Sequence, residues 1–316
     1  MPEWWIERGI GETRAVLVED SEIVEGRILL EGAVACGSVL SARLIIAASR
    51  NAIARDEAGT EYLLPHGASG VTDGATLNIE VTREAIPGTE PWKRPLARMS
   101  DAPCREAEEI EGKELPFPAP RDALAGVGWD DLLEQARSGL VRFAGGELRI
   151  LPTPAMTLVD VDGPLDPDEL AILGASEAAR TIRRLDIGGS IGVDLPTTKG
   201  RSARQGAAAA IDSVLPQPFE RTAVNGFGFV QIVRPRRRAS LIELAQDRAA
   251  FETRALLRRA AFGPPGPKRL VGHPAVLAAL ETHPEWRDAL ARQAGGAIGL
   301  RADAALPMSG GYAENV

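Results

Sequence analysis

The spacing of hydrophobic and polar residues changes about halfway along the chain. In the first part, residues 38–46 and 75–81 hold apolar side chains at alternating positions, and glycines separate them from similar short runs at 52–55 and 61–64. This pattern is typical of β strands, and four such runs suit a small antiparallel barrel. From residue 147 onward, strand-like runs alternate with stretches in which apolar residues recur every three to four positions. That second pattern predicts alternating strands and helices.

Two further segments flank the predicted barrel. Residues 5–28 favour two strands joined by a turn, because an alternating run over 13–18 ends at Asp20 and Ser21. Residues 101–120 are acidic and contain prolines. This composition predicts a linker or an exposed strap between the two parts.

In the second part, the apolar run 155–159 leads into Asp160, and the run 189–193 leads into Asp194. The stretch between them, 167–185, predicts a helix. Its expected buried stripe comprises Leu170, Leu173, Ala178, Ile182 and Leu185. The remaining pattern predicts a strand at 147–150, a helix at 203–215, a strand at 227–233 and a long helix at 240–260 that begins with a cap at Ser240 and Glu243.

Carboxylates at the ends of the two apolar runs are the first candidate chemistry. Asp160 and Asp162 are two residues apart, so on a strand they point to the same face. A strand–helix–strand crossover would bring Asp194 beside them. Clustered carboxylates either repel one another or hold a hard cation such as Mg²⁺. The alternative is that these residues are acidic simply because strands end at solvent.

Charge is distributed unevenly along the chain. The net charge is −8, yet residues 199–238 contain eight basic and two acidic residues. This segment therefore carries +6, while the rest of the chain carries −14. A protein that binds phosphates needs a basic surface rather than a basic whole. The alternative is a solvated, arginine-rich turn.

Composition excludes several classes of protein. The sequence contains no run of about 18 apolar residues, so we expect no membrane span and no membrane partner. Its first residues lack the basic start and apolar core of a signal peptide. Cys36 and Cys104 are the only cysteines and form no CxxC motif, which argues against a disulfide framework or a cysteine zinc site. We therefore expect a cytoplasmic protein.

Several motifs of the second part resemble the catalytic half of the ribonuclease E/G family. They are the segments 157–162, 184–194, 225–229, 234–236, 239–241, 273–276 and 300–303. The resemblance implies an α+β or α/β fold with a DNase I-like catalytic half and an inserted OB-type β-barrel. The implied domains are N-terminal strands packing on the catalytic part (1–31), an OB-type RNA-binding barrel (32–98), an acidic linker (99–143), a DNase I-like domain (144–245), and a C-terminal helix with a small α/β unit (246–316).

Residue by residue, the resemblance assigns Asp160 and Asp194 to the two magnesium ligands of the family. Asp162 stands where the family usually has an asparagine, and Gln231 stands in place of a glutamate. The zinc-binding cysteine pair of the family, expected near residues 244–251, is missing, so a zinc-linked dimer is not expected. In the family, the 5′-end sensor domain lies between the barrel and the catalytic half. Here only residues 101–143 occupy that place, and this segment is too short to form the domain.

The resemblance implies a Mg²⁺-dependent endoribonuclease that prefers single-stranded RNA, with Asp160, Asp162 and Asp194 as its catalytic residues. Candidates for binding RNA are the basic residues Lys199, Arg201, Arg234, Arg236, Arg237 and Arg238, and, in the barrel, Lys93, Arg94, Tyr62 and His66 with Trp92. Tyr62 is equally compatible with a place in the barrel core, and His66 with an ordinary loop. Two alternatives stay open: a non-catalytic RNA-binding protein derived from the family, and an unrelated α/β metal-dependent phosphoesterase.

Overall fold

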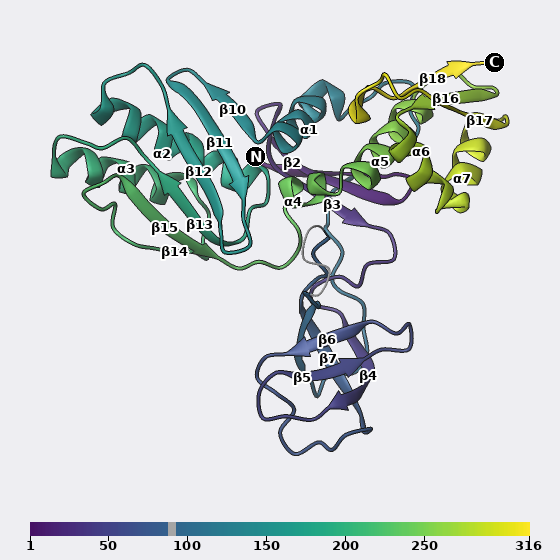
Figure 1. The fold of residues 1–316 in the computed structure, drawn as a ribbon, viewed down its shortest axis with the longest axis horizontal. Coiled ribbons are helices and arrows are strands. Elements are labelled where there is room, and N and C mark those ends of the chain that lie inside the picture. The colour runs from purple at the N-terminus through teal and green to yellow at the C-terminus, as the bar shows by residue number, and fades with distance from the viewer. Residues whose placement is uncertain (88–92) are drawn as a thin grey trace. The chain divides into compact units, whose positions relative to one another are not determined.

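The computed structural model describes residues 1–87 and 93–316, which form two compact units (Figure 1). The first unit comprises Met1–Glu31, Ile110–Arg137 and Leu244–Val316. The second comprises Gly32–Glu109 and Ser138–Glu243. Each unit therefore combines segments that are far apart in the sequence. In this part of the chain, no helix has both the length and the apolar character needed to cross a membrane.

A four-stranded sheet in the order β3-β2-β1-β9 begins the first unit. Its strands are β1 (Glu3–Arg8), β2 (Glu12–Glu19), β3 (Glu22–Leu30) and β9 (Lys113–Leu115). The turn expected at Asp20 and Ser21 joins β2 to β3, and both residues have positive φ angles of 50° and 66°. Such angles match the tight hairpin turns that continue the twist of two antiparallel strands. The N-terminal segment thus forms three strands, one more than its pattern predicted.

The prediction of a linker over 99–143 is wrong for most of its second half. Besides β9, this segment forms a short 3₁₀ helix (Ala125–Val127), helix α1 (Trp129–Ser138) and strand β10 (Leu140–Phe143). Trp129, Leu132, Leu133 and Ala136 recur at helical spacing and are buried. Asp130 and Asp131 lie in the first turn of α1, where negative charge interacts favourably with the helix dipole.

The C-terminal part of the first unit contains α5 (Arg248–Ala261), α6 (Pro274–Glu281) and α7 (Pro284–Ala294) with a three-stranded sheet in the order β17-β16-β18. These strands are β16 (Lys268–Gly272), β17 (Ile298–Ala302) and β18 (Tyr312–Asn315), and a 3₁₀ helix spans Met308–Gly310. The long helix predicted over 240–260 is instead two helices, α4 (Leu241–Gln246) and α5. Ser240 and Glu243 form the expected capping box of α4, but Asp247 starts a new helix by accepting a hydrogen bond from the Ala250 amide.

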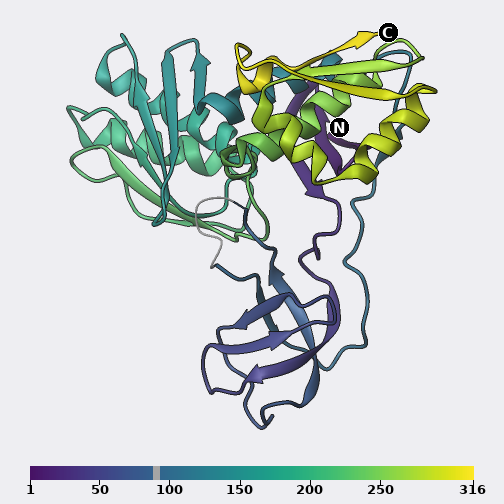
Figure 2. The same ribbon diagram turned by 45° about the vertical axis from the view of Figure 1, so that its right-hand side comes forward.

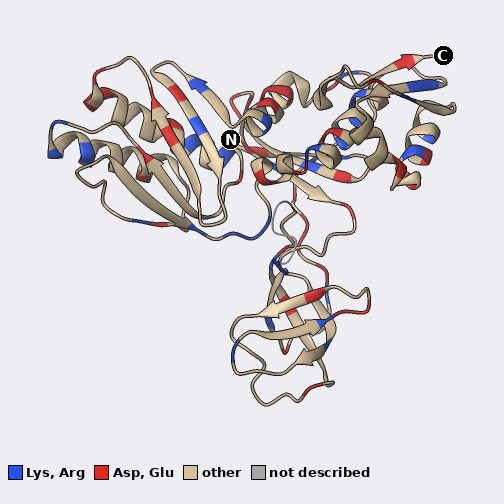
Figure 3. Cartoon of the chain, viewed as in Figure 1, with Lys and Arg blue, Asp and Glu red and all other residues tan. Residues whose placement is uncertain are grey.

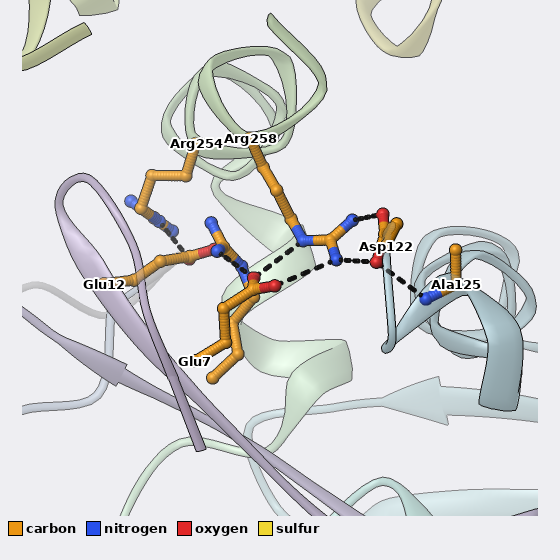
Figure 4. Close-up of polar contacts among 7 residues, drawn as sticks. Glu7, Glu12, Asp122, Ala125, Arg254 and Arg258 are labelled. Atoms are coloured by element: carbon orange, nitrogen blue, oxygen red, sulfur yellow. Dashed lines mark hydrogen bonds and ion pairs between the residues drawn. The ribbon is translucent and has the colours of Figure 1, made fainter. Parts of the chain in front are cut away.

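Buried charges join the N-terminal strands to α5 (Figure 4). Glu7 accepts hydrogen bonds from Arg14 and Arg258, and Glu12 accepts from Arg14 and Arg254. The members of this network, which we call the ionic cluster, are Glu7, Glu12, Asp122, Arg14, Arg254 and Arg258. Residues 1–31 share their compact unit with residues 110–137 and 244–316. The expectation that they pack on the catalytic part stays a prediction.

The barrel expected over 32–98 is present in the second unit. Strands β4 (Val39–Ile46), β5 (Ala52–Arg55), β6 (Glu61–Leu64), β7 (Thr76–Arg83) and β8 (Leu96–Met99) close in the order β4-β5-β6-β8-β7. Its interior is filled by small and branched side chains, including Leu44, Ala54, Leu64, Ile79 and Val81. The short β-like runs therefore predicted the barrel strands, and their alternating side chains fill its interior.

A six-stranded sheet in the order β10-β11-β12-β13-β15-β14 forms the rest of the second unit. Its other strands are β11 (Gly146–Pro152), β12 (Thr157–Asp162), β13 (Gly189–Asp194), β14 (Glu220–Arg221) and β15 (Phe229–Arg234). Strands β12 and β13 are parallel and are joined by helix α2 (Pro167–Arg184), as a strand–helix–strand crossover requires. Helix α3 (Arg201–Val214) packs on α2 (Figure 2).

Small residues pack α2 against the sheet. The buried residues of α2 include Gly174, Ala175, Ala178 and Ala179, whereas Leu173 is 43% exposed. The prediction that Leu173 belongs to the buried stripe is therefore wrong. Alanine and glycine at these positions allow the helix backbone to lie close to its neighbours, which leaves the larger leucine at the edge of the contact.

Candidate functional site

Side chains alternate between the two faces of the six-stranded sheet. Val159, Val161, Ile191 and Val193 point to the buried face that carries α2. The opposite side, which we call the open face, is partly exposed, and Leu151 and Val233 are 57% and 50% exposed there. Its residues include Glu147, Arg149, Leu151, Leu158, Asp160, Asp162, Asp194, Phe229, Gln231 and Val233. The open face is therefore where this sheet can meet a ligand.

Asp160 and Asp194 are register partners in the parallel ladder of β12 and β13. Residues in register on adjacent strands lie about 5 Å apart and point to the same face. The prediction that these two aspartates occupy neighbouring strands of one sheet is confirmed. Both stand at the carboxyl ends of parallel strands, where open α/β sheets commonly bind ligands.

Asp162 lies apart from this pair. Strand β13 ends at Asp194, so it offers no partner to Asp162, whose register partner is Glu147 on β11. One carboxylate oxygen of Asp162 accepts a hydrogen bond of 2.9 Å from the Gly163 amide. Among residues 1–87 and 93–316, no three acidic, histidine or cysteine side chains are grouped as ligands of one metal ion. The expected cluster of three carboxylates is therefore wrong, and a pair is found.

A pair of carboxylates suits Mg²⁺. This ion prefers oxygen ligands and usually keeps several waters, so that proteins hold it with one or two carboxylates and the phosphates of the substrate. Asp160 is half-buried and Asp194 is exposed, which leaves room on the solvent side for water and substrate. Two carboxylates in register on one face therefore supply oxygen donors of the kind that Mg²⁺ prefers.

Arg149, which was not among the residues predicted from the sequence, lies on the open face beside Asp160. Arg149 on β11 is the register partner of Asp160, and its guanidinium donates a 2.6 Å hydrogen bond to Glu147. Hydrogen bonding to Glu147 and the charges of Glu147, Asp162 and Asp160 raise the pKa of Arg149. Figure 3 shows these acidic and basic segments side by side on β11 and β12. The alternating spacing of Glu147 and Arg149 on one strand was the signal that could have identified them.

On the β15 side, Phe229 lies next to the carboxylate pair of Asp160 and Asp194. It is the register partner of Asp194 on β15, and its ring lies over Gly192. A Cβ atom at Gly192 would stand 2.6 Å from the tip of that ring, so only glycine leaves the ring in this position. Gln231 donates a 3.0 Å hydrogen bond to the Ser190 hydroxyl. An apolar ring and a neutral amide thus flank the carboxylates on this side.

Most of the predicted phosphate-binding arginines near β15 have local structural partners. Arg234 donates a 2.9 Å hydrogen bond to the carbonyl of Ile187, just beyond the end of α2. Arg236 pairs with Glu243, the residue that caps α4, and Arg238 pairs with Asp186 at 3.1 Å. These three side chains are half-buried, and their assignment to phosphate binding stays a prediction. Their charges satisfy the ends of neighbouring helices and turns.

Other predicted residues are more exposed. Arg237 and Arg201 are exposed, the latter at the first position of α3. Lys199 is exposed but pairs with Asp166 at 2.6 Å, and hydrogen bonding to this carboxylate raises the pKa of Lys199. The accessible basic residues of this segment therefore lie at the start of α3 and at Arg237, after β15.

In the barrel, the prediction that Tyr62 binds RNA is wrong. Its side chain belongs to the core and is 1% exposed, and its hydroxyl donates a 3.0 Å hydrogen bond to Asp56. A ring in this position cannot stack with an RNA base. His66 is exposed in the turn after β6, and Arg94 pairs with Glu61. Lys93 follows the undescribed segment, and the prediction for Trp92 lies outside the described residues.

Comparison with known proteins gives no further guide to the site. No protein-family model matches this chain, and no curated protein matches it either.

Proposed function

We propose that this protein is a Mg²⁺-dependent endoribonuclease that acts on single-stranded RNA, with a DNase I-like catalytic half as in the ribonuclease E/G family. The observation that carries the proposal is the in-register pair of Asp160 and Asp194 on parallel strands. The motif resemblance described for residues 147–303 supports the choice of RNA as the substrate.

Each group of the open face has a role in this proposal. Asp160 and Asp194 would hold Mg²⁺, which supplies charge neutralisation at the scissile phosphate when it is bound. Arg149 stands next to Asp160 and presents a planar guanidinium that suits phosphate oxygens. Phe229, the register partner of Asp194, would border the bound phosphodiester on the Asp194 side. Together they would position a phosphodiester over the carboxylate pair.

A non-catalytic RNA-binding protein of the same descent is the second candidate. The observation that favours it is the position of Arg149, whose positive charge beside Asp160 opposes the binding of a second cation. In that case the open face would bind RNA through arginine alone. The two candidates differ in whether cleavage occurs, which an assay can decide directly.

The test is incubation of the purified protein with a 5′-labelled, AU-rich single-stranded RNA in the presence of Mg²⁺ or EDTA. We expect Mg²⁺-dependent fragments that carry 5′-phosphates, and we expect Asp194→Asn to abolish them while RNA binding in EDTA is retained. Asp288→Asn, at an exposed position of α7, is the matched control. Binding without cleavage in the parent protein favours the second candidate. Cleavage that survives Asp194→Asn places the active site elsewhere.

A further inference from the structure

A groove with a volume of about 570 Å³ lies in the second unit between α3 and the segment that joins β14 to β15. Its polar lining comprises Arg201, Arg204, Gln205, Asp212 and Arg221. The rest of the wall is formed by alanines at 208, 209 and 223, Val224 and Gly226, which are shorter than the polar side chains. The volume is within the range of about 300–1,000 Å³ that small-ligand sites occupy.

The charge of the groove is positive. Arg221 pairs with Asp212 through a 2.7 Å hydrogen bond, and these two charges balance. Arg201 and Arg204 remain as two further cations on successive turns of α3. Arg204 donates a 3.4 Å hydrogen bond to the neutral hydroxyl of Thr198, so its charge is not cancelled by that contact. The groove is therefore complementary to an anion such as a phosphate.

The residue that follows the groove lining in the sequence is a strongly exposed aromatic. Phe227 comes directly after Gly226 of the lining and is 82% exposed, the most exposed aromatic ring among the large hydrophobic residues at the described surface. The Asn225 side chain accepts hydrogen bonds from the amides of Phe227 and Phe229 at 2.9 and 3.1 Å, which gives the backbone of this loop a defined turn. An exposed aromatic ring of this kind is typical of a platform on which a base stacks.

The loop of Phe227 is attached to the segment that leaves the carboxylate pair. Leu195, the residue after Asp194, donates a 3.3 Å hydrogen bond to the Gly228 carbonyl, and Thr197 donates one of 3.4 Å to the Phe227 carbonyl. Gly228 has a φ of +94°, and a Cβ atom there would stand 2.1 Å from the Leu195 carbonyl oxygen. This position therefore requires glycine, which keeps the platform next to the end of β13.

We propose that Phe227 stacks with an unpaired base of single-stranded RNA while Arg201 and Arg204 bind the adjoining phosphates in the groove. This subsite rests on the proposed function, since it takes RNA as the substrate, and it extends the binding surface beyond Asp160 and Asp194. Stacking on an aromatic ring tolerates any base, whereas a paired base offers no free face. The subsite therefore selects unpaired segments rather than a sequence.

The test compares two labelled oligomers by fluorescence anisotropy in EDTA, where cleavage is absent. One is an A- and U-containing single-stranded RNA of about ten nucleotides, and the other has the same length with abasic riboses in place of all bases. We expect Phe227→Ala to weaken binding of the first oligomer about fivefold to one-hundredfold and to leave binding of the abasic oligomer unchanged. Phe227→Trp should retain affinity, and Tyr312→Ala, at an exposed aromatic of the other unit, should have no effect.

The arginines give a second readout. Replacing Arg201 and Arg204 together with glutamine should weaken both oligomers alike and reduce the salt dependence of binding, because each phosphate contact contributes to that slope. Equal affinity of Phe227→Ala and the parent protein for the base-containing oligomer overturns the subsite alone. No RNA binding by the parent overturns the subsite and the proposed function together. A Phe227-dependent affinity without Mg²⁺-dependent cleavage supports the subsite and rejects the nuclease.

Discussion

Arg149 lies directly opposite Asp160 in the antiparallel ladder of β11 and β12. On the other side of Asp160, the parallel ladder places Asp194 in the same row. The row therefore carries one cation and two anions across three neighbouring strands. This arrangement makes Arg149 a competitor for any metal ion that binds the carboxylate pair.

Replacement of Arg149 with methionine should strengthen binding of a divalent cation. Removing one positive charge beside the pair removes a repulsion that acts on a bound cation, so we expect Mn²⁺ to bind roughly threefold to tenfold more tightly. The measurement is a Mn²⁺ titration followed by electron paramagnetic resonance. Arg287→Met, at an exposed position of α7, is the control. Weaker binding of Mn²⁺ to Arg149→Met would contradict this account of the site.

Glu7→Gln should destabilise the first unit strongly. Glu7 is 1% exposed and pairs with Arg14 and Arg258 at 2.7 and 2.9 Å, so neutralising it leaves buried guanidinium charge without compensation. The expected loss in free energy of unfolding is about 3–5 kcal/mol. Urea denaturation followed by tryptophan fluorescence reports this unit, because Trp4, Trp5, Trp129 and Trp286 all belong to it.

The matched control is Glu114→Gln. Glu114 pairs with Arg8 at 3.1 Å, but both side chains are more than half exposed. Water screens this pair, and its removal should change the free energy of unfolding by less than about 1 kcal/mol. Equal effects of Glu7→Gln and Glu114→Gln on the free energy of unfolding would show that burial does not determine how much the ionic cluster stabilises the protein.

Asp122 should make the stability of the first unit dependent on acid pH. Burial opposes ionisation of this carboxyl, but hydrogen bonds from Arg258 and from the amides of Ala125 and Leu124 outweigh it and lower the pKa of Asp122. Because the pKa of Asp122 is lower in the folded state than the unfolded value of about 3.8, its ionised carboxylate stabilises the fold at pH values above 3.8. This contribution is lost as the pH falls through the lower folded-state pKa. Asp122→Asn should be less stable than the parent at neutral pH, and the difference should shrink on acidification below pH 4. Unfolding curves at a series of pH values check this, and a difference that grows on acidification would refute it.

Deletion of residues 32–109 with a glycine–serine linker in their place should leave the rest of the chain folded. The barrel has its own core around Leu44, Tyr62, Leu64 and Ile79, separate from the core near α5, α6 and α7. The deletion removes the hydrogen bond from the Glu84 amide to the Arg237 carbonyl, a contact near the protein surface. We expect cooperative thermal unfolding with retained helical circular dichroism. A non-cooperative transition would show that the barrel is needed for folding of the remainder.

Local spacing in the sequence determined the elements that depend on near neighbours. Alternation at 38–46 and 75–81 predicted β4 and β7, and the capping box of Ser240 and Glu243 predicted the start of α4. The two apolar runs that end in Asp160 and Asp194, with a helix-long stretch between them, predicted parallel neighbouring strands. The strands and the cap follow from periodicity and capping, in which the residues that interact lie within a few positions of one another. The pairing of the strands of Asp160 and Asp194 was predicted from the helix-long spacing together with the family resemblance.

Contacts between distant segments decided what the sequence could not. The partners of Arg234, Arg236 and Arg238 are carbonyls and carboxylates whose positions depend on how strands and helices pack, so their spacing alone resembled a phosphate-binding surface. The register of β11 against β12 placed Arg149 beside Asp160 and Glu147 beside Asp162, and a shift of one residue would have turned every one of these side chains to the other face. The closure of the barrel likewise put Tyr62 inside. Tertiary structure therefore determines which charged and aromatic side chains are accessible to a ligand, because the others are buried or form ion pairs within the protein.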